Sequence, residues 1–166
     1  MGTNFYLNIK NKDFAEKYFQ GEYTIYELAA FRYEVHIGKT SMGWKSLYQS
    51  HKIAYNSVEE MMSFIKEHYP KEIKIYDEYD NELNPDELKK RLIDWDDLFV
   101  KQYMKYVPEK KNKKYSHYYF VKGTKDDYDI TIPYDHVEYS KFNTYNQGLK
   151  YYHDEDGYDF TDGDFC

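Results

Sequence analysis

Cysteine is nearly absent from this chain of 166 residues, which contains only Cys166. A single cysteine excludes a disulfide framework and any zinc site built from several thiolates. A chain end is also a poor place for a nucleophile, because terminal residues are usually poorly ordered. No apolar run reaches membrane-spanning length, and the first residues lack the basic and apolar regions of a signal peptide. We therefore expect a cytoplasmic protein.

Catalytic and metal-binding patterns are scarce as well. The chain has six histidines, and none of them stands at a metal-ligand spacing such as His-Glu-x-x-His. They are His36, His51, His68, His117, His136 and His153. The sequence therefore predicts no metal and no cofactor, and it does not favour an enzyme.

Apolar and charged residues are present in the proportions of a globular protein, at 41% and 32%. The length predicts one domain with a core of useful size. The chain is unusual in its 22 tyrosines. An AT-rich genome would produce this bias without functional meaning, whereas half-buried tyrosines also suit the recognition of proteins or flat ligands.

Hydrophobic periodicity predicts a single α+β domain over residues 1–150, with a mixed or antiparallel sheet and two main helices packed on one face. Strands are expected near 3–9, 32–39, 44–49 and 72–76, and the main helices near 57–69 and 84–106. A short helix capped by Asn11 should precede Gly21, and a hairpin is expected around residues 122–125. Residues 25–31 fit a helix or a strand.

The main helices have clear start signals. Ser57-Val58-Glu59-Glu60 has the pattern of a capping box, in which serine and glutamate satisfy each other's backbone donors. Asn84-Pro85-Asp86-Glu87 supplies a cap, a proline at the first helical position and acids at the positive end of the helix dipole.

A glycine-containing stretch, residues 35–46, is the candidate ligand site. Gly38 and Gly43 have the separation of the glycines in a P-loop, but Trp44 stands before Lys45-Ser46 and turns the lysine away from a phosphate. The functional interpretation that is left is a weaker anion-binding nest of backbone N–H groups. The alternative is a plain hairpin between strands 33–40 and 44–49. The candidate residues are His36, Gly38, Lys39, Thr40, Ser41, Gly43, Trp44 and Lys45.

The segment 151–166 carries most of the net charge. Six acids and no Lys or Arg occur there, and removing them from the total of −7 leaves about −1 for residues 1–150. The acids are Asp154, Glu155, Asp156, Asp159, Asp162 and Asp164. Their spacing does not fit a calcium loop, since the glycine stands at the fourth position instead of the sixth. The interleaved aromatic residues favour a docked extension, whose acids would imitate phosphates to a basic protein.

Several blocks resemble a group of short bacteriophage proteins of uncharacterised activity. These blocks are Met1–Leu7, His36–Trp44, Ile75–Leu83 with Pro85–Leu88, and Gly157–Phe160 with Asp164–Cys166. The phage proteins begin with MGTNYYL and carry an HIGKSSAGW block. Many of them place cysteines before that block, which suggests a zinc site. This chain has no cysteine there, so metal binding does not carry over.

The resemblance implies a phage origin, where small non-enzymatic proteins commonly inhibit host defence. We therefore predict a non-catalytic accessory protein in the host cytoplasm that binds and sequesters an anionic or nucleotide-like ligand at residues 36–45. The alternative is an acidic nucleic-acid mimic that binds a host defence protein, of the CRISPR or restriction type, through residues 154–164. A small enzyme is the third class. Direct binding to nucleic acid or to a membrane is not expected.

Overall fold

The structure, a computed structural model, describes residues 2–28, 31–41, 44–96, 122–124, 127–129, 151–154, 156 and 158–163. Its first half contains β1 (Gly2–Ile9), α1 (Lys12–Phe19), β2 (Thr24–Leu28), β3 (Phe31–Ser41), β4 (Trp44–Gln49) and α2 (Val58–His68). Then follow β5 (Ile73–Asp77), β6 (Glu82–Leu83), α3 (Pro85–Leu88) and a π-helical segment, η1 (Lys89–Asp94). The last strands are β7 (Lys122–Thr124), β8 (Asp127–Asp129), β9 (Tyr151–His153) and β10 (Asp159–Thr161).

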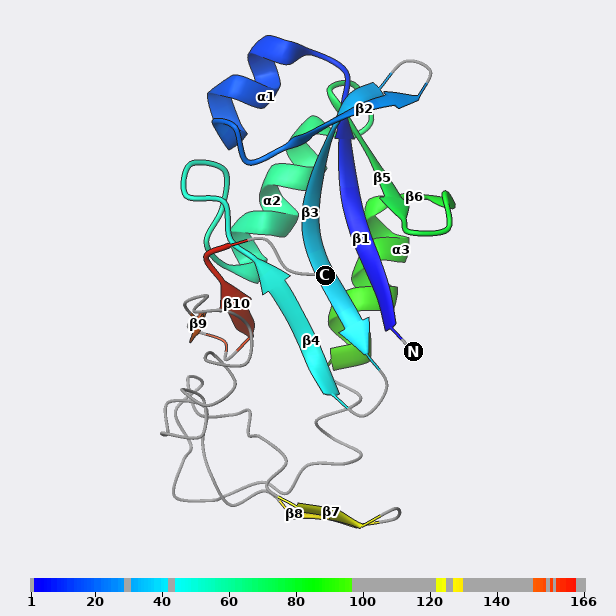
Figure 1. Cartoon of the computed structure of the whole chain (residues 1–166), viewed down its shortest axis with the longest axis vertical. Helices are drawn as coiled ribbons and strands as arrows, with labels where there is room; N and C mark the ends of the chain where they lie inside the picture. Colours follow the sequence, from blue (N-terminus) through cyan, green and yellow to red (C-terminus); the bar gives the residue numbers. More distant parts are fainter. Residues whose placement is uncertain are drawn as a thin grey trace.

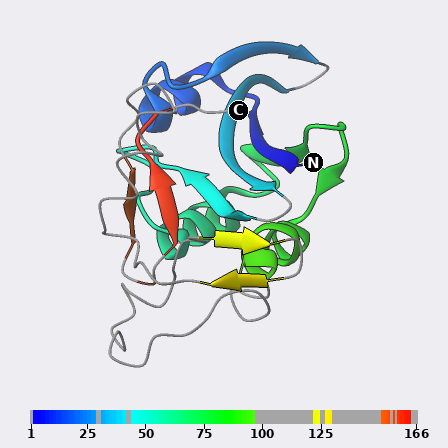
Figure 2. The same ribbon diagram turned by 60° about the horizontal axis from the view of Figure 1, so that its bottom comes forward.

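Eight of these strands form one mixed sheet, which confirms the α+β prediction. The order is β6-β5-β1-β3-β4-β10-β9, and β2 pairs with β3 outside this path. The strand pairs are antiparallel except that β10 runs parallel to β4. In Figure 1, α2 and α3 lie behind the sheet, so that one face is covered by helices. Figure 2 shows the strong curvature of β3.

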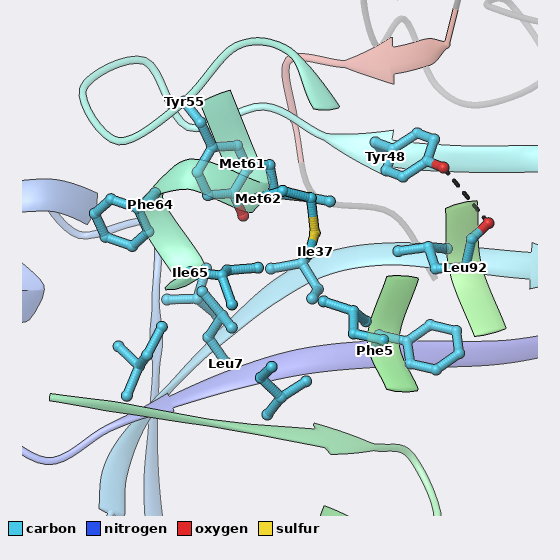
Figure 3. Packing of buried hydrophobic residues seen from close by; sticks show 14 of the residues in the cluster. Phe5, Leu7, Ile37, Tyr48, Tyr55, Met61, Met62, Phe64, Ile65 and Leu92 are labelled. Carbon is cyan, nitrogen blue, oxygen red and sulfur yellow. Dashed lines mark hydrogen bonds between the residues drawn. The ribbon is translucent and has the colours of Figure 1, made fainter. Parts of the chain in front are cut away.

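The core fills the space between the sheet and these helices (Figure 3). Alternate residues of the strands, such as Leu7, Ile37 and Ile75, are completely buried there. Met61 and Ile65 of α2 complete the layer, and Leu92 of η1 lies over β3 and β4. The predicted apolar stripes of the strands and of α2 therefore form the core, as their periods of two and 3.6 residues require.

A β-bulge interrupts the alternation in β3. Phe5 pairs with Gly38 and Tyr6 pairs with His36, so that Ile37 is the extra residue. Gly38 thereby comes onto the helical side, where an added Cβ would lie 3.1 Å from the Leu47 carbonyl oxygen and 3.2 Å from a methyl group of Leu92. This position requires glycine because η1 packs directly on the strand.

The helix caps agree with the sequence except at one residue. The Ser57 side chain accepts a hydrogen bond from the Glu60 N–H, but the Glu60 carboxylate accepts from the N–H of Asn56 rather than from that of Ser57. The predicted capping box is therefore only half formed at α2. At α3 it is complete, since Asn84 and Glu87 accept from each other's backbone N–H groups.

The ambiguous segment 25–31 is extended where it is described. β2 pairs with the start of β3, with Ile25 opposite Tyr33, so that pairing with a neighbour decides the conformation. The described part of the predicted 84–106 helix reaches residue 96, and the remainder lies outside the described residues. Near 122–125, the first three residues are themselves a strand paired with β8, so the predicted turn over 122–125 is wrong at these three positions.

The acidic segment supplies two strands of the main sheet. β10 pairs with β4 and β9, and Phe160 stacks on Tyr48 with ring centroids 5.2 Å apart. Asp154 fixes the turn between β9 and β10, because its carboxylate accepts from the N–H groups of Asp156 and Tyr158 and from that of Val58 at the start of α2.

Candidate ligand-binding pocket

The face of the sheet opposite the main helices is lined by polar side chains. Strand pairing places Tyr6 beside His36, and Asn4, Glu34 and Gln49 belong to the same face. In Figure 1 this face is turned toward the viewer. Asn4, His36 and Gln49 are buried in spite of their polarity. Buried polar groups need partners, and here they find them in one another.

His36 is held between two amides. Its Nδ1 lies 2.9 Å from Gln49 Oε1, and its Nε2 lies 2.9 Å from Asn4 Oδ1. When both amide oxygens face the ring, both ring nitrogens must donate, which suits the imidazolium. A neutral ring has one donor and one acceptor, and it fits when one amide is rotated so that its NH₂ group faces the ring instead. In both arrangements the ring is fixed on each side, which makes His36 a positioned group rather than a free base.

A pocket of about 680 Å³ opens over this network. Its floor is formed by Tyr6, Glu34, His36 and Gln49, and its walls by residues 20–24, 52–53 and 162–163. The walls come from the α1–β2 connection, from the segment after β4 and from the end of β10. Only the folded chain brings these segments together. The volume lies in the range of ordinary small-molecule sites.

One wall is tied to the sheet through His51. The Nε2–H of this buried histidine donates to the His36 carbonyl oxygen at 2.9 Å, and its Nδ1 lies 3.4 Å from Glu22 Oε2. The ring of Phe19, at the end of α1, meets the His51 ring edge-on at 5.0 Å. These contacts position the α1–β2 connection relative to the pocket floor.

The pocket lining is acidic. It contains the carboxylates of Glu22, Glu34 and Asp162 and the ammonium group of Lys52. Burial raises the pKa of Glu34 above its ordinary value of 4.5, and the charge of Asp80 adds to the effect. Within the described part of the chain, the Glu34 carboxylate has neither a hydrogen bond nor an ion pair.

Among the predicted ligand residues whose side chains the structure describes, His36 lines this pocket. Gly38 is buried in β3 and is paired on both sides, with Phe5 and Tyr48. Lys39 and Thr40 are half-buried parts of the same strand and do not line the pocket. Ser41 and Trp44 pair as the last and first residues of β3 and β4, as the hairpin interpretation predicts.

Three members of that predicted set cannot be placed in a site. Gly43 lies outside the described residues, and for Trp44 and Lys45 only the strand backbone is described. The nest of converging N–H groups therefore stays a prediction.

The predicted partner-binding acids have different environments. Asp154 and Asp159 are buried, at 7% and 6% exposure, so they are not offered to a partner. Asp156 is half-buried and Asp162 is exposed. Glu155 and Asp164 lie outside the described residues.

Sequence reasoning missed Tyr6, Glu34 and Gln49 as pocket residues. Their only signal was their place between core residues of alternating strands, which marks the side of the sheet facing away from the core. Nothing in the sequence showed that this face is itself partly covered, because the covering residues come from three separate segments, of which 162–163 lies more than 100 positions after the floor residues.

No family model, curated protein or solved structure matches this chain. Within the residues that the structure describes, no group of three or more His, Cys, Asp or Glu side chains is arranged to hold a metal ion. In the same part of the chain, no helix is long and apolar enough to cross a membrane.

Proposed function

We propose that this chain is a non-catalytic binding protein that captures a small nucleotide-like molecule in the pocket around His36. The observation that carries this proposal is the pocket itself, whose floor is a fixed polar network with unused hydrogen-bonding groups. Small-molecule sites are typically pre-formed cavities with a few converging polar groups. A His36 ring engaged at both nitrogens supports binding rather than proton transfer.

The biological setting of the proposal rests on the resemblance to short phage proteins. We propose that the protein acts in the host cytoplasm and withholds the captured molecule from a host defence system. The sequence-based hypothesis placed the ligand at residues 36–45. We now propose that it binds in the pocket, and His36 belongs to both proposed sites. The nucleotide-like character is kept, since the lining offers tyrosine rings for stacking and amides for base edges.

Calorimetric titration with nucleosides and with linear and cyclic nucleotides tests this proposal. Binding of at least one compound is expected, and Thr24→Trp should abolish it, because Thr24 is an exposed residue of the pocket wall. Ile25→Trp is the matched control, since Ile25 is 68% exposed and does not line the pocket. No heat with any nucleoside-containing compound, or equal losses in both variants, would overturn the proposal.

A second candidate function is the acidic inhibitor of a basic, nucleic-acid-handling defence protein. The exposed Asp162, which lines the same pocket as the exposed Ile53, favours it. Asp156→Asn combined with Asp162→Asn should then abolish capture of a host protein from lysate, and native binding should weaken as salt rises. Asp154 must be left intact in this test, because its carboxylate holds the β9–β10 turn.

A further inference from the structure

Two groups on the pocket floor have unused hydrogen-bonding capacity of opposite kinds. Glu34 presents a carboxylate, which only accepts, and it has no partner in the described part of the chain. Gln49 uses Oε1 toward His36, and its Nε2 has no partner there either. An amide nitrogen carries two donors. The floor therefore presents an acceptor and a donor to the same pocket, from the neighbouring strands β3 and β4.

Both groups are held in place by the sheet. Glu34 lies two residues before His36 on the same face of β3, a distance of about 7 Å along an extended chain. Gln49 is fixed against the His36 ring from β4. A ligand that enters the pocket meets these groups without rearranging the backbone.

The net charge of the pocket lining determines which ligands Glu34 and Gln49 can bind. Three carboxylates line the pocket, and Lys52 contributes a positive charge to the same lining. The total remains negative even if His36 is protonated. A negative site repels a phosphate chain, whereas an ionised carboxylate is a strong acceptor for hydroxyl and amino groups.

We infer that Glu34 and Gln49 recognise the uncharged part of the ligand, namely the ribose hydroxyls or the base edge of a nucleoside, and that the pocket discriminates against added phosphate groups. The inference rests on the proposed function and specifies its ligand class. A carboxylate is well suited to the ribose because it accepts from hydroxyl groups, as in dinucleotide-binding folds. Tyr6 and Tyr23 line the same pocket and supply aromatic surface to it.

The test compares adenosine, guanosine, cytidine and uridine with their 5′-monophosphates and 5′-triphosphates by calorimetry on the full chain. For the base that binds, affinity should fall by roughly two- to fivefold for each added charge, the range of exposed ion-pair effects. Glu34→Gln should weaken nucleoside binding by roughly tenfold or more, because a hydrogen bond to a charged acceptor is lost. Glu59→Gln, on the exposed side of α2, is the control and should change nothing.

Asp162→Asn separates charge from contact. It should improve monophosphate binding by up to roughly fivefold while leaving nucleoside binding unchanged, because it removes repulsion at the pocket edge. A triphosphate that binds the native protein more tightly than its nucleoside, or a Glu34→Gln variant with native affinity, would overturn this inference and leave the proposed function standing. Failure of every compound to bind would overturn both.

Discussion

The two faces of the central sheet use buried residues in different ways. On the helical face, side chains such as Leu7, Ile37 and Ile65 are buried by shape and apolarity alone. On the other face, Asn4, His36 and Gln49 are buried as a hydrogen-bonded set. Apolar burial contributes most of the favourable free energy of folding, whereas a satisfied polar network contributes little net stability and provides fixed geometry. The comparison therefore assigns stability to one face and fixed polar geometry, on which the proposed recognition rests, to the other.

Truncation in the helical layer should have the largest effect on stability. Ile65→Ala removes a completely buried side chain of α2 and leaves a cavity, so that the free energy of unfolding should fall by about 2–5 kcal/mol. Urea denaturation measures this loss. Lys66→Ala, next in the helix and exposed, is the control and should change stability by no more than about 0.5 kcal/mol. Similar losses in both variants would contradict this assignment of the core.

Asp77 is a buried charged residue on the helical face of the sheet, and replacing it tests how much its hydrogen bonds stabilise the fold. Its carboxylate accepts hydrogen bonds from Arg91, Tyr79 and Asn81. Burial alone would raise the pKa of Asp77, but the hydrogen bonds from Asn81, Arg91 and Tyr79 together lower it below its ordinary value of 3.8. Asp77→Asn should therefore cost about 1.5–3 kcal/mol at neutral pH.

The sign of the pH dependence follows from this lowered pKa. The stabilisation by Asp77 is fully present above pH 3.8 and is lost as the pH falls through the lower pKa of the folded state. The stability difference between the native protein and Asp77→Asn should shrink over that acidic range. Denaturation curves from pH 7 downward measure it, and a difference that grows on acidification would refute the account.

Gly38 tests how closely η1 packs on the sheet. Gly38→Ala places a Cβ 3.1 Å from the Leu47 carbonyl oxygen and 3.2 Å from Leu92, and this overpacking should cost about 1–3 kcal/mol. Adding Leu92→Ala gives the new methyl group space, so the double variant should lose less stability than the sum of the two single variants. Strict additivity in melting experiments would show that the contact with Leu92 is unimportant.

Replacement of Glu34 should have the smallest effect on stability. The pH dependence of its contribution should also be opposite in sign to that of Asp77. Because burial, assisted by Asp80, raises the pKa of Glu34, folding favours its protonated form. Its contribution to stability is fully present below pH 4.5 and is lost as the pH rises through the raised pKa of the folded state. Glu34→Gln should thus match or exceed native stability at pH 7 by about 0.5 kcal/mol. A clearly less stable variant would make Glu34 a structural residue rather than a recognition group.

Much of the helical face was predictable because local patterns report one-sided burial. The alternation in β1 and the stripe of α2 identified most of the buried apolar residues of those two elements, and the cap at Asn84 located α3. The bulge at Ile37 was not predictable, since it depends on how η1 meets β3. The hairpin between β3 and β4, one of two readings of the glycine stretch, is the one that the strand pairing shows.

The polar face was decided by tertiary structure. The sequence by itself determined where β1, β3, β4, β5 and α2 form and where α3 begins, which residues of β1 and α2 face the core, and that the last sixteen residues are acidic and aromatic. It did not determine that Asp154 holds the start of α2, or that residues 20–24 and 162–163 meet around His36. Hydrophobic periodicity records only whether a position is buried, because apolar burial is non-directional. Hydrogen-bonded partners and pocket walls depend on contacts between distant segments, and those exist only once the chain has folded.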